Sequence, residues 1–211
     1  MFDTTPQLDC AGRMLKLDRV RVMGIVNVTP DSFSDGGAHV TPDAAVAHGL
    51  LLAGQGADIL DVGGESTRPG AASVPLQEEL RRVLPVIERL ARETALPISV
   101  DTSHPEVMRA AVAAGAGFIN DVRALQAPDA LHVAAQLGVP VCVAHMQGEP
   151  RSMQQTPQYA DVVEDVHRFL AERLFDINCD GPCKKTVRDQ GRSPTNVCTV
   201  EERTGNTDSL R

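Results

Sequence analysis

The sequence of 211 residues has no tryptophan, one tyrosine and an aromatic content of only 3%. Valine, leucine, isoleucine and alanine must therefore build the core, which is typical of parallel α/β folds with aliphatic buried strands. No apolar run approaches the roughly 18 residues that a membrane-spanning helix needs, and residues 1–20 contain no signal-peptide hydrophobic segment. We therefore expect a soluble, cytoplasmic protein without a membrane partner.

Positive charge is also scarce. The 20 lysine and arginine residues face 28 aspartates and glutamates, which gives a net charge of −8. Nucleic-acid-binding surfaces are basic, so we expect no nucleic-acid partner. Neither GxGxxG nor GxxxxGK[ST] follows any predicted strand, which argues against a nucleotide-binding fold.

Apolar periodicity predicts alternating strands and helices through the first 175 residues. Short apolar runs predict buried strands, and a segment with helical spacing follows each of them. The predicted strands are 22–28, 57–62, 97–101, 117–121 and 139–145, and the predicted helices are 43–53, 76–93, 105–114, 128–137 and 160–175. Before these five units, residues 5–20 are compatible with a short hairpin that turns near Ala11 and Gly12.

Polar residues recur at the C-terminal ends of the five predicted strands, among them Asn27, Asp61, Asp101, Asn120 and His145. Open doubly wound sheets and closed barrels both place their sites at these ends. Polar groups on five successive strands favour a ring of strands that converges on one mouth. We therefore predict an α/β fold of the (β/α)₈ TIM-barrel type, incomplete at about five βα units, in a domain spanning residues 1–175.

The periodic pattern ends near residue 175. Residues 176–211 contain six basic and six acidic residues, three of the five cysteines and few large apolar side chains. The pair Cys179 and Cys183 has no second Cys/His pair at zinc-finger spacing, so zinc binding by these cysteines is not expected. We predict a disordered tail here, separate from the domain.

Two glycine-containing loops carry candidate functional groups. After the first strand, Asn27, Asp31 and Asp35 offer the hard oxygen ligands that suit Mg²⁺ beside a phosphate, although the same residue types are common in turns. After the second strand, Arg68 could pair bidentately with a carboxylate or phosphate, or it could be a solvated side chain.

Asp101 and Asn120 are candidates for binding a heterocycle. Asp101 could accept two N–H donors from an amidine-like edge, and Asn120 can both donate to and accept from a ring. The alternatives are that Asp101 caps the following helix and that Asn120 belongs to a turn.

Taken together, these segments resemble the signature of the dihydropteroate synthase family. Two long motifs carry the resemblance, Met23-Gly-Ile-Val-Asn-Val-Thr-Pro-Asp-Ser-Phe-Ser-Asp-Gly-Gly37 and Asp61-Val-Gly-Gly-Glu-Ser-Thr-Arg-Pro-Gly70. Three shorter ones follow in the family's order, Ile98-Ser-Val-Asp-Thr-Ser103, Ile119-Asn-Asp121 and His145-Met146. The resemblance covers about residues 10–175.

This resemblance implies a (β/α)₈ barrel of folate biosynthesis with Mg²⁺ as cofactor. Such enzymes join 6-hydroxymethyl-7,8-dihydropterin diphosphate to p-aminobenzoate and release 7,8-dihydropteroate and pyrophosphate. Family members are commonly homodimers and are targets of sulfonamides, which compete with p-aminobenzoate. The implied roles are catalysis for Asn27, Asp35 and Arg68, metal binding for Asn27, and substrate binding for Phe33, Thr67, Arg68, Pro69, Asp101 and Asn120.

The chain departs from the family pattern after about residue 175. The family's later Asp-Pro-Gly-Phe-Gly-Phe-Gly-Lys-like strand, its Ser-Arg-Lys-like segment and its final Arg-x-His pair have no counterpart here. Two alternatives to a working synthase therefore stay open: a non-catalytic fragment with at most weak pterin binding, and a pterin-binding domain of the methyltetrahydrofolate type.

Overall fold

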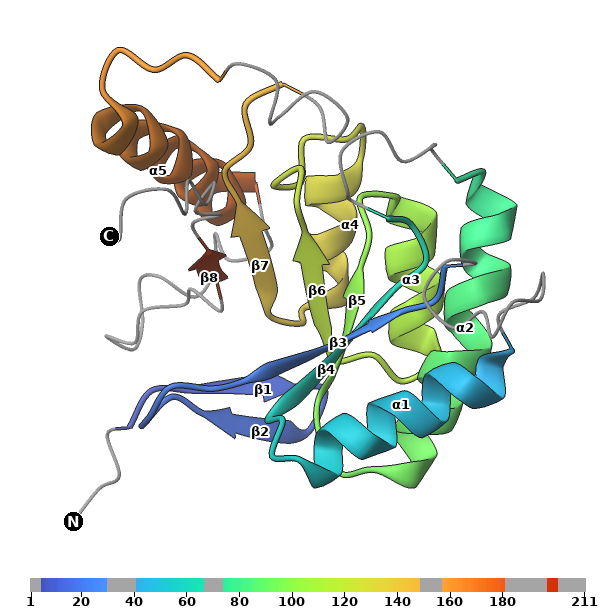
Figure 1. The fold of residues 1–211 in the computed structure, drawn as a ribbon. Helices are drawn as coiled ribbons and strands as arrows, with labels where there is room; N and C mark the ends of the chain where they lie inside the picture. The colour runs from blue at the N-terminus through green and yellow to red at the C-terminus, as the bar shows by residue number, and fades with distance from the viewer. Residues whose placement is uncertain (1–4, 30–40, 67–73, 149–156, 181–196, 201–211) are drawn as a thin grey trace, which may run out of the picture.

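A six-stranded parallel sheet with five helices and a separate two-stranded hairpin form the fold (Figure 1). The computed structural model describes residues 5–29, 41–66, 74–148, 157–180 and 197–200. The hairpin strands are β1 (Gln7–Cys10) and β2 (Arg13–Lys16). The sheet contains β3 (Met23–Asn27), β4 (Ile59–Gly63), β5 (Ile98–Asp101), β6 (Phe118–Asp121), β7 (Val141–Ala144) and β8 (Val197–Val200). The helices are α1 (Pro42–Gly54), α2 (Leu76–Glu93), α3 (Pro105–Ala113), α4 (Ala130–Leu137) and α5 (Val162–Asp180).

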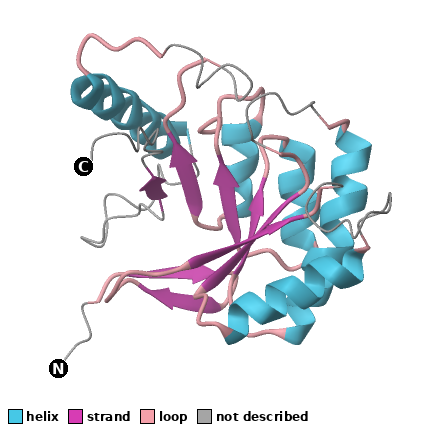
Figure 2. Ribbon diagram, viewed as in Figure 1, coloured by secondary structure: helices cyan, strands magenta, loops and turns pink. Residues whose placement is uncertain are grey.

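The strands lie in the sheet in the order in which they occur in the chain, from β3 to β8, and all pairings are parallel. Right-handed connections between such strands place their helices on one face. Figure 2 shows α1 to α4 together along one side of the sheet. This is the winding of a barrel section, because a doubly wound sheet reverses its strand order. The predicted α/β fold, an incomplete barrel of this type, is confirmed.

Two features lie within the range for which a tail was expected. Helix α5 continues to Asp180, and strand β8 pairs in parallel with β7. Strand β8 has the sequence Val-Cys-Thr-Val, which is rich in the β-branched residues that favour strands. The domain boundary at residue 175 and the disorder of the remaining tail stay predictions.

The main core lies between the sheet and the helices. Strand residues Val26, Val62 and Val100 are fully buried there, and α2 contributes Ile87 and Leu90. The amphipathic spacing predicted for residues 76–93 therefore gives the observed helix, which buries its apolar stripe against the sheet.

The hairpin closes the N-terminal end of the strands. Its residues Leu8, Cys10 and Leu15 form a second buried cluster with Ile59, Phe118 and Cys142. The contact is close, because a Cβ atom on Gly117 would lie 2.3 Å from the carbonyl oxygen of Cys10. This leaves the C-terminal ends of the strands as the open end of the sheet.

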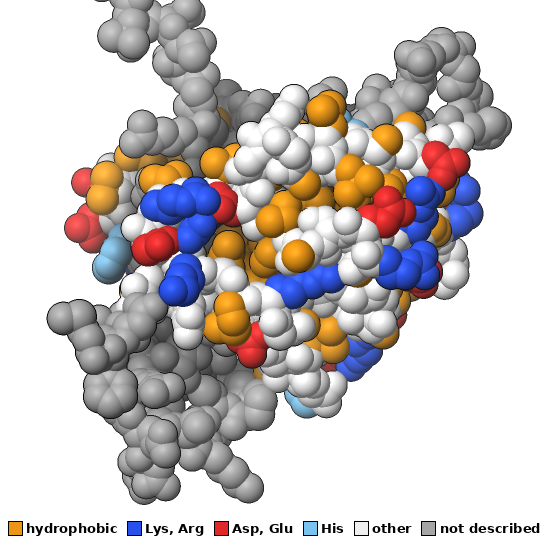
Figure 3. Space-filling model, turned by 90° about the horizontal axis from the view of Figure 1, so that it is seen from below, with side chains coloured by type: hydrophobic (Ala, Val, Ile, Leu, Met, Phe, Trp, Pro, Cys, Tyr) orange, Lys and Arg blue, Asp and Glu red, His pale blue; other side chains and the backbone are white. Residues whose placement is uncertain are grey.

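An ion-pair network ties the segment before β3 to the residue before β4. Asp58 accepts hydrogen bonds from the Val22 N–H at 2.9 Å, from Arg21 at 2.8 Å and from Arg19. These partners, led by the Val22 N–H, lower the pKa of Asp58 to about 2. Figure 3, seen from below, shows basic, acidic and hydrophobic side chains interspersed on that face.

Within the described residues, no helix is both long and apolar enough to cross a membrane.

Candidate active site at the C-terminal ends of the strands

Four residues form a row across the sheet at its open end. The strand register aligns Asn27 with Gly63, Gly63 with Asp101, and Asp101 with Asn120. Aligned residues of neighbouring parallel strands point to the same face. Val26, Val62 and Val100 belong to the helix-packed core, so the row and Asp61, which lies two positions before Gly63, are on the opposite face, which lines the barrel interior. The structure thus brings together the predicted site residues Asn27, Asp101 and Asn120.

Asp61, which the sequence places at a strand end without an assigned role, is a further member of this group. Its side chain is buried, with the residue 1% exposed, and its Oδ2 accepts a hydrogen bond of 2.9 Å from the Asn120 amide nitrogen. Its Oδ1 has no hydrogen-bond partner among the described residues. The Asp61–Asn120 pair therefore presents a fixed carboxylate edge and a fixed amide beside Asp101.

Gly63 gives the Asp101 side chain its space. A Cβ atom at position 63 would lie 3.3 Å from Asp101 Oδ2 and 3.4 Å from Asp101 Cβ. A side chain there would have to displace the carboxylate or be displaced by it. The first glycine of the Gly63-Gly64 pair thus keeps one position of the row open.

The carboxylates of the site disfavour each other's ionised forms. Burial raises the pKa of Asp101 well above its ordinary value, and the nearby charges of Asp61, Asp121, Glu79 and Glu65 raise it further. Burial also raises the pKa of Asp61, while Ser99 and Asn120 oppose that shift. Ligand N–H donors or a cation would relieve this repulsion, because both stabilise the carboxylate form.

Asp121 shapes the loop that follows β6. Its carboxylate accepts the hydroxyl of Ser103 at 2.5 Å and the backbone N–H groups of Arg123 at 2.9 Å and Leu125 at 2.8 Å. Burial raises its pKa, and these three hydrogen bonds oppose the rise. Asp121 therefore fixes the backbone beside Asn120 and does not face the site.

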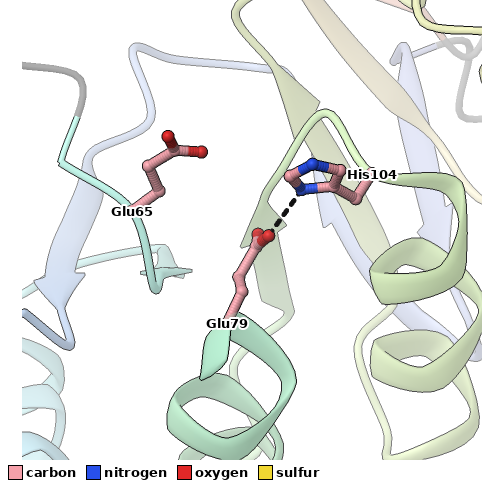
Figure 4. A group of neighbouring side chains, drawn as sticks. All are labelled: Glu65, Glu79 and His104. Atoms are coloured by element: carbon pink, nitrogen blue, oxygen red, sulfur yellow. Dashed lines mark hydrogen bonds and ion pairs between the residues drawn. The ribbon is translucent and has the colours of Figure 1, made fainter. Parts of the chain in front are cut away.

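A second group of side chains lies next to the row. Figure 4 shows Glu65 after β4, Glu79 on α2 and His104 before α3. The His104 Nδ1 is 2.7 Å from Glu79 Oε2, and one potential ligand atom of each residue lies within 4.8 Å of the others. Two carboxylates and one imidazole at this spacing are able to hold a divalent metal ion.

The remaining predicted site residues lie on segments outside the described part of the chain. These are Phe33 and Asp35 on the first loop and Thr67, Arg68 and Pro69 on the second. The strands from which both loops continue end side by side, because the Val28 N–H donates to the Gly63 carbonyl oxygen at 2.7 Å. The two loops therefore start at the same edge as the row.

The donor chemistry at the end of β3 fits the Mg²⁺ expected from the sequence. Asn27 carries an amide oxygen, a hard ligand of the kind Mg²⁺ prefers, and it stands in the row with Asp101.

Comparison with known proteins gives consistent results. The family described as "Pterin binding enzyme" matches residues 23–182. The dihydropteroate synthase of Escherichia coli K12 is 53% identical over 181 residues, which cover 86% of this chain and 64% of that protein. The chain thus spans less than two thirds of the length of the curated relative it matches.

Solved structures agree with the sequence matches. The Xanthomonas albilineans dihydropteroate synthase with 4-aminobenzoic acid has a TM-score of 0.79 and 67% identity, covering 84% of this chain and 63% of that one. A structure of dihydropteroate synthase from the same organism with 7,8-dihydropteroate has a TM-score of 0.77 and 58% identity, covering 92% and 64%. The similarity continues beyond residue 175, where the sequence motifs end.

Proposed function

Because this chain belongs to the pterin-binding enzyme family, we propose that it is a dihydropteroate synthase, a transferase of folate biosynthesis. It joins 6-hydroxymethyl-7,8-dihydropterin diphosphate to p-aminobenzoate and gives 7,8-dihydropteroate and pyrophosphate. The single observation that carries the proposal is the group formed by Asp61, Asp101 and Asn120 at the open end of the sheet.

The pterin ring matches this group in hydrogen-bonding character. Its amidine-like edge offers N–H donors, and Asp101 and Asp61 are carboxylates with raised pKa values that gain from accepting them. The amide of Asn120 already donates to Asp61, so its carbonyl oxygen is oriented by that hydrogen bond. We assign pterin binding to Asp101 and Asn120, with Asp61 as an added member.

The reaction needs no unusually strong acid or base. The amine nitrogen of p-aminobenzoate forms a bond to the methylene carbon of the pterin. The carbon–oxygen bond to the diphosphate breaks, its electron pair leaves with pyrophosphate, and the amine loses one proton. Electron donation by the pterin ring stabilises positive charge on the methylene carbon, so the protein's task is to position both substrates and stabilise the departing anion.

Mg²⁺ would be held by Asn27 together with the diphosphate, and when bound it would neutralise charge on the leaving pyrophosphate. We assign Asp35 and Arg68 to the same catalytic end of the site, with Arg68 suited to pair with an anion. Phe33, Thr67 and Pro69 are assigned to substrate binding, and Phe33 and Pro69 would line the p-aminobenzoate pocket where sulfonamides compete.

Turnover and binding need separate assays, because the chain spans 64% of its E. coli relative. Pyrophosphate release is measured with a coupled assay that contains both substrates and Mg²⁺. Calorimetry with the pterin diphosphate alone measures binding. Release that requires both substrates supports the synthase, whereas pterin binding without release supports a non-catalytic pterin-binding fragment. Absence of both signals would refute the assignment of the site.

A matched pair of variants tests the site itself. Asn120→Ala removes the hydrogen bond to Asp61 and one group that faces the ring. We expect it to weaken pterin binding on the order of 10- to 100-fold, because the ring group that Asn120 faces would then be buried without a hydrogen-bond partner, which costs about 1–3 kcal/mol. Gln136→Ala on the exposed side of α4 serves as the control and is expected to leave binding unchanged.

The remaining assignments follow from the same family. The names of the relatives favour the synthase over a methyltetrahydrofolate-type domain. Cys10 is a buried free cysteine, in keeping with the reducing cytoplasm that we propose as the location. We also propose that the chain shares the homodimeric tendency of its family, which size-exclusion chromatography with light scattering would test.

A further inference from the structure

His104 occupies a helix N-cap position without acting as a cap. It directly precedes Pro105 at the start of α3, and its side chain makes no capping hydrogen bond. N-cap positions favour serine, threonine, aspartate and asparagine, whose side chains bond to the first N–H groups of the helix. The imidazole is directed instead toward α2, where Nδ1 lies 2.7 Å from Glu79 Oε2.

Glu79 is a buried carboxylate with an unused oxygen. The residue is 1% exposed, and its Oε1 has no hydrogen-bond partner among the described residues. Burying a carboxylate without full compensation is unfavourable, because its charge loses the solvation by water. Burial accordingly raises the pKa of Glu79, a shift that Thr102 and His104 oppose and the charge of Glu65 reinforces.

A glycine directly after β4 allows α2 to pack close to that strand. A Cβ atom on Gly64 would lie 2.8 Å from Val83 Cγ1 and 3.1 Å from Glu79 Cγ. A side chain at position 64 would therefore displace Val83 and crowd Glu79, and the glycine leaves Glu79 its place at this depth. The adjacent Glu65 then places a second carboxylate near the first, although like charges in a partly buried site repel.

We propose that Glu65, Glu79 and His104 form a binding site for a divalent transition-metal ion, with Zn²⁺ as the favoured occupant. One ligand atom of each lies within 4.8 Å of the others. Ligands about 2.0–2.2 Å from a tetrahedral Zn²⁺ are roughly 3.3 Å apart, so the three side chains need to move by about 1 Å or less. An ion would engage the unused oxygen of Glu79 and neutralise the repulsion between the two carboxylates.

The donor set distinguishes this site from the Mg²⁺ site proposed at Asn27. Imidazole suits zinc and neighbouring transition metals, whereas Mg²⁺ prefers oxygen ligands and retains several waters. Three protein ligands leave a fourth position for water, as in zinc sites that are not closed by a fourth side chain. The ion would link the end of β4, the first turn of α2 and the start of α3 beside Asp101.

Cobalt binding provides a readout that does not depend on turnover. The metal-free full-length chain is titrated with Co²⁺ and followed by visible absorption, and Zn²⁺ is then added to displace it. We expect one equivalent of Co²⁺ with d–d bands of a four- or five-coordinate site, and displacement by Zn²⁺. A thiolate-to-cobalt charge-transfer band would show that cysteines hold the ion and would overturn the proposal.

Two histidine variants decide the ligand assignment. His104→Asn is expected to lower the Co²⁺ and Zn²⁺ affinity at least tenfold, on the order of the loss seen when even outer-shell partners of a metal site are removed. The His104 side chain is 41% exposed, so this substitution is tolerable for the fold. His132→Asn on α4, whose partner is Gln136, is the control and is expected to bind both ions as the parent does.

Thermal unfolding supplies a second measurement. Zn²⁺ is expected to raise the Tm of the parent chain and of His132→Asn, because a ligand that binds only the folded state stabilises it, and to raise that of His104→Asn less at the same concentration. Equal affinity in His104→Asn and the parent, or no binding of either ion, would leave Glu79 and His104 as an ion pair only and would overturn the proposal.

Discussion

Replacing Gly117 with alanine perturbs the closed end of the sheet without touching the candidate active site. The new Cβ atom would lie 2.3 Å from the carbonyl oxygen and 2.5 Å from the carbonyl carbon of Cys10. Both are backbone atoms, so no side-chain rotation relieves the contact. The hairpin must retreat by about 1 Å to reach ordinary van der Waals distance.

The loss in free energy of unfolding that this movement of the hairpin causes can be bounded from two sides. Overpacking of a well-packed core costs about 1–3 kcal/mol. Complete detachment of the hairpin would expose Leu8, Leu15 and Cys10, and fully burying a side chain of leucine size contributes about 1.5–3 kcal/mol. We expect a loss of about 3 kcal/mol, which for a chain of this size lowers the Tm by roughly 6–12 °C.

Thermal unfolding followed by circular dichroism measures this loss, and Gly54→Ala is the matched control. Gly54 ends α1, and an added Cβ there meets no atom within 4 Å, so its substitution is expected to be neutral or to stabilise by up to about 1 kcal/mol. Pterin affinity of Gly117→Ala below its melting range is expected to equal that of the parent. Equal Tm values for Gly117→Ala and the parent would refute the close packing of the hairpin, and a large loss of pterin affinity would refute its separation from the site.

Three further predictions concern titrating groups. Pterin affinity is expected to fall as the pH drops through the raised pKa of Asp101, because only the carboxylate accepts hydrogen bonds from both N–H donors of the ring. Calorimetry across pH should show this dependence in the parent. In Asp101→Asn the affinity should be low and independent of pH. Burial raises the pKa of Cys10 to about 11, so on the order of one thousandth of this thiol is ionised at pH 8. Mass spectrometry should therefore find Cys10 alkylated by iodoacetamide only after unfolding. Labelling of the folded chain at the rate of a free cysteine would contradict its burial. The pKa of Asp58 is lowered to about 2 in the folded chain, so Asp58 stabilises the fold above about pH 4, near its ordinary pKa, and this stabilisation is lost as the pH falls toward 2. Between these pH values the stability of Asp58→Asn should therefore depend less on pH than that of the parent. Identical slopes would count against the ion-pair network.

The five strands from β3 to β7, the five helices and three members of the site could be predicted because each depends on local pattern, whereas β8 lies in the segment for which a tail was expected. Apolar runs mark the buried strands, and Asn27, Asp101 and Asn120 stand at the ends of such runs. Parallel pairing then brings strand ends together whatever their separation in the chain. The row across β3 to β6 follows from these two facts.

Asp61 and Glu79 were harder to assign, because their roles arise from tertiary contacts. Asp61 stands near the end of its strand, but its role depends on Asn120, which follows 59 residues later. Glu79 is charged, and helical glutamates are normally solvated. The available signal was its spacing, because position 79 is four residues before Val83 and eight before Ile87 and thus falls on the buried stripe of α2.

The strands follow one another in the sheet in chain order, and this has a consequence for folding during synthesis. Each of the pairings from β3 to β7 joins consecutive βα units, so a nascent chain can add each unit to the sheet as it leaves the ribosome. The hairpin differs, because the cluster around Cys10 also requires Phe118 of β6 and Cys142 of β7. The hairpin must therefore wait about 130 residues for its packing partners, and until then its apolar side chains are available to chaperones or to neighbouring chains.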